Sequence, residues 1–165
     1  MPLREYLRHH VWEPAGMSST DFETFGKPLP NQAVGYSHGN GKVVVAKKTN
    51  VSSKYPGGGM VSTAEDLVRF AAKLQDGTLV KAETFESMLV PPRLPAPKKS
   101  SYGFGFSVSK EPEYGRVVSH SGEIVGACTH LRILRDHGIV VAVISNTRED
   151  SVRDVAVSIG KLAMD

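Results

Sequence analysis

Three consecutive residues, His120, Ser121 and Gly122, combine side-chain types that can line a carbonyl-binding site. An imidazole can donate a hydrogen bond or relay a proton, and it titrates near neutral pH. The hydroxyl of Ser121 can both donate and accept. Gly122 has no Cβ, so the backbone of a substrate can approach it closely. Without further context, a single strand histidine is more simply a structural residue.

The residues around this tripeptide predict an antiparallel sheet. The tripeptide ends an apolar run at 116–120, and further strand-like runs lie at 102–109, 127–134 and 139–145. The connections between the runs are short and contain glycine, proline or charged residues, which favours antiparallel neighbours. We therefore expect His120 to lie at the end of a strand.

Helical patterns precede and follow the predicted sheet. Apolar residues recur at intervals of three and four, which predicts helices over 2–12, 62–75, 81–89 and 150–164. Helices, then antiparallel strands, then a helix packed on the sheet are typical of the α+β class. We expect a single partial domain over 1–165, with a helical and loop part at 1–100 and the sheet with its last helix at 101–165.

Local signals predict where two of these helices begin and end. Pro14 and Gly16 are expected to end the first helix. Ser62 and Glu65 form a capping-box pattern for the second. We interpret the three glycines at 57–59 as a tight turn before that helix, because glycine runs alone are weak evidence for a ligand loop.

Four blocks of the sequence follow one another in a recognisable order. They lie at 2–20, 57–70, 102–106 and 120–122. Together they resemble the C-terminal half of the serine beta-lactamase and penicillin-binding-protein family. The last block begins with histidine, where most of the family has lysine. In this respect the sequence resembles the class C-like and esterase-like branch, which includes the mitochondrial beta-lactamase-like protein.

This resemblance implies a serine hydrolase that cleaves an amide or ester bond through an acyl-enzyme, with no cofactor and no metal. It implies that His120 hydrogen-bonds the hydroxyl of the family's second motif or the substrate carboxylate. Ser121 and Gly122 would bind the substrate. A backbone N–H near Glu123 or Ile124 would be the second oxyanion donor. Histidine in place of the family's usual lysine favours an esterase-, amidase- or peptidase-like activity over penicillin hydrolysis.

Two of the family's motifs are expected upstream of this sequence: the nucleophile motif Ser-x-x-Lys, and Tyr-x-Asn or Ser-x-Asn. Neither form of the second motif occurs in the 165 residues. Ser107 and Lys110 form one Ser-x-x-Lys string, but residues three apart on a strand point to opposite faces. Ser158 and Lys161 form another near the end of the chain, which we interpret as coincidence.

Three interpretations of the whole chain follow. The favoured one is a truncated gene product of a serine hydrolase, inactive alone because it lacks the nucleophile. The alternatives are a natural non-catalytic binding or interaction module, and one half of a split enzyme. The expected partner is a small-molecule or peptide substrate of the full-length enzyme. An exposed sheet edge would also permit self-association.

Composition narrows the function classes. The net charge of +3 comes from scattered Lys and Arg, apart from pairs at 47–48 and 98–99, and does not favour nucleic-acid binding. The six histidines lack metal-type spacing, so no metal site is expected. No apolar run spans a membrane and no signal peptide is visible, so localisation stays open, although family members are often exported. The single cysteine, Cys128, is expected to be a small buried residue.

Overall fold

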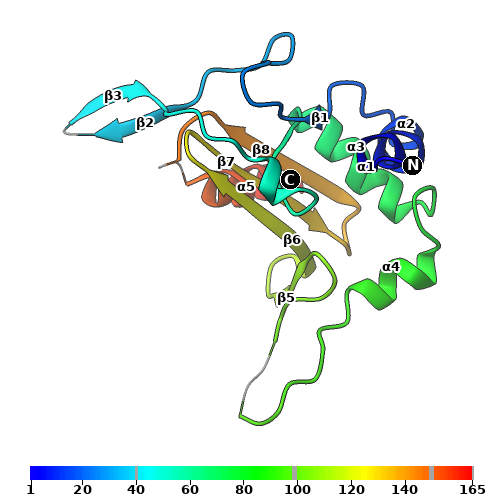
Figure 1. The fold of residues 1–165 in the computed structure, drawn as a ribbon. Coiled ribbons are helices and arrows are strands. Elements are labelled where there is room, and N and C mark those ends of the chain that lie inside the picture. Colours follow the sequence, from blue (N-terminus) through cyan, green and yellow to red (C-terminus); the bar gives the residue numbers. More distant parts are fainter. Residues whose placement is uncertain (40, 98–99, 149–150, 165) are drawn as a thin grey trace.

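An antiparallel four-stranded sheet with helices on both faces organises the structure (Figure 1). This computed structural model describes residues 1–39, 41–97, 100–148 and 151–164. The strands lie in the order β5-β6-β7-β8, and their bounds are Ser107–Glu111, Gly115–Ile124, Ala127–Leu134 and Ile139–Ser145. Every neighbouring pair is antiparallel. The predicted α+β class is therefore confirmed.

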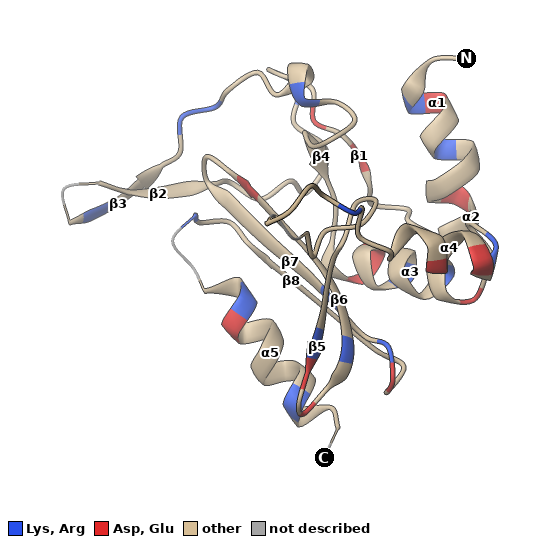
Figure 2. Cartoon of the chain, turned by 90° about the horizontal axis from the view of Figure 1, so that it is seen from below, with Lys and Arg blue, Asp and Glu red and all other residues tan. Residues whose placement is uncertain are grey.

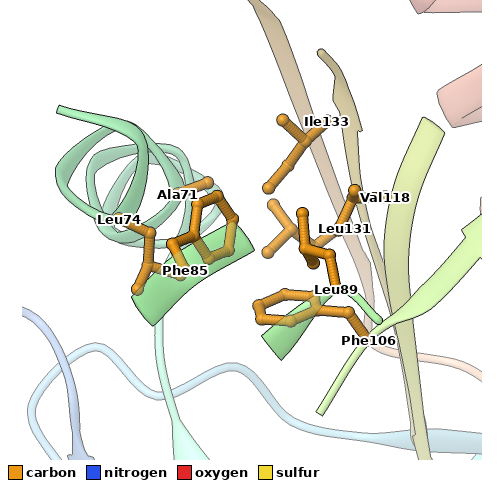
Figure 3. Packing of buried hydrophobic residues seen from close by; sticks show 8 residues of the cluster. All are labelled: Ala71, Leu74, Phe85, Leu89, Phe106, Val118, Leu131 and Ile133. Atoms are coloured by element: carbon orange, nitrogen blue, oxygen red, sulfur yellow. The ribbon is translucent and has the colours of Figure 1, made fainter. Parts of the chain in front are cut away.

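Helices cover the two faces of this sheet with separate cores. Helices α3 (Ala64–Gln75) and α4 (Ala82–Met88) pack on one face, and α5 (Val152–Leu162) packs on the other (Figure 2). Figure 3 shows the first core, which is formed by Ala71, Leu74, Phe85, Leu89, Phe106, Val118, Leu131 and Ile133. The second core, on the α5 side, contains Tyr114, Val117 and Leu134, with Val157 and Met164 packed against it.

Strands β7 and β8 match the predicted ranges, but β6 is longer than predicted. It continues past His120, because Gly122, Glu123 and Ile124 keep pairing with β7 up to Ala127. His120 therefore lies within a strand, and the expectation that it ends one was wrong. The long pairing arises because β6 and β7 are joined by a tight turn of only two residues, at 125–126.

The predicted strand at 102–109 also needs correction, because regular strand structure begins only at Ser107. The Gly103 N–H donates to the Phe106 carbonyl at 2.8 Å, which closes a turn. The Phe104 N–H donates to the Met88 carbonyl at 2.7 Å and fixes this turn to the end of α4. Phe106 is buried in the first core as a result, whereas Phe104 is exposed.

The first helical segment is longer than predicted and contains a wide turn. It consists of α1 (Leu3–Leu7), the π-helical turn η1 (Arg8–Trp12) and α2 (Glu13–Ala15). Pro14 lacks an N–H, and in a regular helix its ring would clash with the carbonyl of His10. The π turn inserts an extra residue and accommodates Pro14. The segment ends at Gly16, whose φ of 68° suits a residue without a Cβ.

The remaining strands form two small sheets. Strands β2 (Tyr36–Gly39) and β3 (Lys42–Val45) form a hairpin, which projects from the rest of the chain (Figure 1). Strands β1 (Asp21–Phe22) and β4 (Met60–Val61) pair next to the first helix of the chain. A short 3-10 turn, η2 (Ser52–Lys54), lies between β3 and β4 in the sequence.

Three further expectations from the sequence concern the burial of Cys128, membrane-spanning segments and residues near segment ends. Cys128 is buried, as predicted. Among the described helices, none is both long and apolar enough to cross a membrane. The lysine pair at 98–99 and Asp150, where the last predicted helix begins, lie outside the described residues.

Glu86 connects α4 to the start of β6 and the end of β7. Its carboxylate accepts from Arg116 at 2.7 Å and from Arg135 at 2.5 Å. The hydrogen bond from Arg116 holds the pKa of the Glu86 carboxyl below its usual value, against the opposing effect of desolvation. Because a depressed carboxyl pKa stabilises the folded state only above that pKa, this contribution is lost as the pH falls through it.

Helix α3 is capped by a different residue pair from the one predicted. The Thr63 hydroxyl accepts from the Asp66 N–H at 3.1 Å, so the cap begins one residue later than the Ser62–Glu65 pattern. The Asp66 carboxylate is only 1% exposed. It accepts from the Ser19 N–H and the Thr20 hydroxyl, both at 2.8 Å. Asp66 thereby ties the segment after the first helix to α3.

We predict that Asp66→Ala lowers the free energy of unfolding by about 1–3 kcal/mol, because the Ser19 N–H and the Thr20 hydroxyl lose the buried carboxylate that accepts from them. Glu65→Ala is the matched control, since Glu65 is an exposed acidic neighbour whose pairing with Arg69 is a surface contact. The control should change stability by at most about 0.5 kcal/mol. Urea unfolding of both variants measures this, and equal losses would contradict the role assigned to Asp66.

Candidate functional site

Strand β6 places His120 and Ser121 on opposite faces of the sheet. His120 is in register with Leu131 of β7 and shares a face with Val118, which packs toward α3 and α4. Ser121 is in register with His130, on the face covered by α5. The two side chains expected to act together are therefore separated by the strand backbone.

The imidazole of His120 is exposed on its face. The described ring nearest to it is that of Tyr102, with 6.3 Å between the ring centroids and an angle of 57° between the planes. Tyr102 comes from the segment that precedes β5 and pairs with Ser107 through a single bridge. This segment places an aromatic side chain and an imidazole side by side at the surface.

Gly122 lies on the same face as His120, two residues further along β6. Its register partner is Thr129 of β7. A Cβ added to Gly122 would lie 2.8 Å from the Thr129 hydroxyl oxygen, closer than such atoms normally approach. A side chain at position 122 would therefore force the Thr129 hydroxyl to move, and its absence leaves space on the surface beside His120.

Part of β6 has an open edge. Strand β5 pairs with β6 over 115–119, and the last pair joins Ser107 to Ser119. Over 120–124, no other strand of the described residues pairs with β6 on this side. The open part of the edge is the part that carries the predicted site residues.

The hydrogen-bond pattern tells which backbone groups point out of this open edge. The Arg135 N–H donates to the Arg116 carbonyl at 3.0 Å, on the β7 side of β6. Backbone groups alternate in direction along a strand, so those of Ile124 also point toward β7. The N–H and C=O groups of Ser121 and Glu123 point outward. Of the two oxyanion donors expected from the sequence, Glu123 therefore has the N–H that reaches the open edge.

His130 of β7 contacts Ser121, and this contact was not identified from the sequence. The Nδ1 of His130 lies 2.8 Å from the Ser121 hydroxyl oxygen, and the residue is 3% exposed. Burial lowers the pKa of His130, and the charges of Arg153, Arg132 and His120 lower it further. A neutral imidazole next to Ser121 can accept its proton in a hydrogen bond. The signal in the sequence was the two-residue spacing of polar residues on β7.

An ion pair lies beside His130 on the same face. The guanidinium of Arg132 donates to both carboxylate oxygens of Glu111 on β5, at 3.2 and 2.6 Å. It also lies over the ring of Tyr114, 4.9 Å from the centroid. The hydrogen bond from Arg132 lowers the pKa of the Glu111 carboxyl. This bidentate geometry fixes the direction of a side chain that is almost fully buried.

The two Ser-x-x-Lys strings lie on different elements, one on strand β5 and one on helix α5. Ser107 and Lys110 lie on strand β5, where residues three apart face opposite sides. Ser158 lies on α5, and its hydroxyl donates to the Asp154 carbonyl at 3.0 Å. Within the described ranges, His, Cys, Asp and Glu side chains form no group of three or more that could hold a metal ion.

Comparison with known proteins places this geometry in context. The model of the Beta-lactamase family matches residues 1–163. Penicillin-binding protein 4* of Bacillus subtilis is 28% identical over 171 residues, which cover 95% of this chain and 38% of that protein. The chain spans between 26% and 38% of the length of the curated relatives that it matches.

Solved structures share the fold. The octameric penicillin-binding protein homologue from Pyrococcus abyssi has a TM-score of 0.79 at 22% identity, over 98% of this chain and 37% of that one. The D-amino acid amidase from Ochrobactrum anthropi SV3, complexed with D-phenylalanine, has a TM-score of 0.72 at 24% identity, over 88% and 45%. At these identities the likeness concerns the fold.

We predict that Gly122→Ala lowers the free energy of unfolding by about 1–3 kcal/mol, because the added methyl group overlaps the Thr129 hydroxyl. Thr129→Ala removes that hydroxyl and should restore most of the loss in the double variant. Thr129→Val keeps the volume of the side chain and should not. Chemical denaturation of the parent chain, the three single variants and the two double variants measures the coupling, and additive effects with no rescue would contradict the contact.

Proposed function

This chain belongs to the beta-lactamase family, and we propose that it supplies the strand side of an active site that hydrolyses an amide or ester bond through a serine acyl-enzyme. The nucleophile would come from polypeptide outside this sequence, since neither of its two Ser-x-x-Lys strings fits. One observation carries the proposal: the edge of β6 is open over 120–124, next to an exposed imidazole.

The open edge supports a substrate that binds in an extended conformation. Ser121 and Glu123 turn their backbone N–H and C=O groups outward, so an extended chain could add to the edge as a further strand. In this arrangement the Glu123 N–H would donate to the oxygen that gains negative charge when the carbonyl is attacked. A backbone donor suits this task because the strand already holds it in position.

His120 would contact one end of the substrate, on the face of the sheet that carries the imidazole. There it would hydrogen-bond the hydroxyl of the family's second motif or the substrate carboxylate. The exposure of the imidazole and the absence of a side chain at Gly122 support this role, because both leave room for a ligand. The ring of Tyr102 would limit the positions that the imidazole can take.

Ser121 would contribute in two ways. Its backbone groups belong to the open edge, and its hydroxyl would bind polar groups of the substrate. The hydrogen bond to His130 supports a fixed orientation of this hydroxyl. A fixed hydroxyl reduces the conformational entropy lost on binding. We therefore expect Ser121 to affect substrate orientation more than bond making.

The class of the bond remains part of the proposal. A neighbour of the same fold is a D-amino acid amidase, which supports an amide as one candidate for the bond that is cleaved.

Self-association of the chain is a further part of the proposal. The outer edge of β8 has no strand partner over 139–145 within the described ranges, and a homologous fold is octameric. Unpaired strand edges readily accept another strand.

We predict that this chain alone hydrolyses neither nitrocefin nor activated esters above background, because Ser107 and Lys110 face opposite sides of β5 and the Ser158 hydroxyl donates to the Asp154 carbonyl. Purified protein in a spectrophotometric assay tests this. Turnover that survives both Ser107→Ala and Ser158→Ala would reveal an unrecognised nucleophile. Loss of turnover in either variant would show that one of the two Ser-x-x-Lys strings is functional after all.

Acylation should appear when the missing motifs are supplied. We propose joining this chain at Met1 to a polypeptide that carries the family's Ser-x-x-Lys and Tyr-x-Asn motifs, and measuring acyl-enzyme formation by mass spectrometry. His120→Ala should lower the acylation rate by roughly 10²–10⁴-fold. His137→Ala, which removes an exposed turn histidine, is the matched control and should leave the rate unchanged.

Thermal melting of the same variants separates chemistry from stability. His120 is exposed, so its loss should change stability little. Ser121→Ala should lower acylation more mildly than His120→Ala. If the His120→Ala fusion is folded and acylates at the parental rate, the role proposed for this strand is wrong.

A further inference from the structure

A second polar site lies on the α5 side of the sheet, opposite His120. It is a hollow of about 290 Å³ between β5, β6, β7 and the start of α5. Five serines line it: Ser101, Ser107, Ser109, Ser119 and Ser121. The proposed hydrolase mechanism uses only Ser121.

The hollow has an excess of positive charge. Arg132 and Arg153 both line it, whereas Glu111 is the one acidic residue in its wall. The carboxylate of Glu111 is bound by Arg132 through two hydrogen bonds. Arg153 is exposed at the start of α5 and makes no ion pair with another residue of the described part of the chain. One guanidinium is therefore available to a ligand.

Two buried nitrogens of the hollow lack a partner. They are Nε2 of His130 and Nε of Arg132, neither of which has a hydrogen bond to any described residue. The Nδ1 of His130 faces the Ser121 hydroxyl at 2.8 Å. When Ser121 donates to Nδ1, the proton of the neutral imidazole resides on Nε2, which is then a donor. Buried donors without acceptors are rare in native proteins and call for an explanation.

We propose that this hollow binds a small oxyanion, a phosphate or carboxylate group, through the guanidinium of Arg153, the hydroxyls of Ser107 and Ser119, and Nε2–H of His130. The oxyanion accepts from all of these donors and balances the excess positive charge. Charge-assisted hydrogen bonds of this kind are roughly twice as strong as neutral ones. The site lies on the opposite face of β6 from His120, so it is separate from the proposed catalytic surface, although Ser121 contacts both.

The proposal has a consequence for the pH dependence of binding. Four charged or titratable groups surround the imidazole of His130: Arg153 from α5, Arg132 from β7, Glu111 from β5 and His120 from β6. Burial lowers the pKa of His130, and the two arginines lower it further. A bound anion opposes the field of the arginines and raises that pKa. By linkage, the anion binds more tightly as the pH falls through the pKa of His130.

The test uses the full chain and the NMR signals of its histidine rings. Sulfate, whose charge is constant over this pH range, stands in for phosphate in one arm, and acetate stands in for a carboxylate in the other. Chloride keeps the ionic strength fixed. We expect a saturable shift of the His130 signals and a higher His130 pKa at saturation. The arm that saturates at the lower concentration identifies the source of the oxyanion.

Two variants and one control make the result specific. Arg153→Gln should weaken binding at least tenfold. Ser119→Ala removes a lining hydroxyl without changing charge and should weaken it by a smaller factor. Lys161→Gln is the matched control, because it removes one positive charge from the same helix at an exposed position outside the hollow. Its affinity should equal that of the parent chain.

The proposal is overturned by either of two outcomes. A shift that rises linearly with anion concentration and does not saturate would indicate only general screening of charge. Equal weakening by Arg153→Gln and Lys161→Gln would indicate the same. The NMR spectrum reports whether each variant is folded, so a loss of binding cannot be confused with a loss of structure.

Discussion

The alternation of side chains along β6 is the constraint on which the rest of the structure depends. Val117 and Val118 are neighbours in sequence, yet each belongs to a different core. A strand between two layers must supply apolar residues to both sides in strict turn. The same alternation continues past the cores and assigns His120 to one surface and Ser121 to the other. The backbone alternates as well, and leaves Glu123 facing the open edge. One geometric rule thus sets the cores, the exposed imidazole and the polar hollow.

The central sheet was predictable because its apolar runs are bounded by clear turn signals. The ranges 127–134 and 139–145 are strands with those bounds. The end of β6 was not predictable, because Gly122 and Glu123 have the composition of a loop and become strand only through pairing with β7. The π turn before Pro14 was not predicted either, and it ends at Trp12, whose ring packs against Phe22 from a distant part of the sequence. Local propensity does not contain such information.

The candidate site, too, has a part that the sequence indicates and a part that depends on how the strands pair. The types and order of His120, Ser121 and Gly122 make them candidates from sequence alone, and their roles stay predictions. The sequence could not identify the partner of Ser121, since His130 is reached through the register between two strands, and register is a property of the sheet. Nor could it indicate the hollow, whose walls come from three strands and a helix. Residues that act through a cross-strand neighbour remain hidden until the pairing is known.

The register of β6 with β7 also has a consequence for how this family of sequences can change. Gly122 faces Thr129 and Ser121 faces His130, so each pair shares a small volume or a hydrogen bond. A larger residue at 122 needs a smaller one at 129, and a residue at 130 that cannot accept a proton leaves Ser121 without a partner. Among homologous sequences, positions 121 and 130, and positions 122 and 129, should therefore evolve as pairs. In an alignment, the hairpin would therefore be visible as covariation between positions nine residues apart in one pair and seven residues apart in the other.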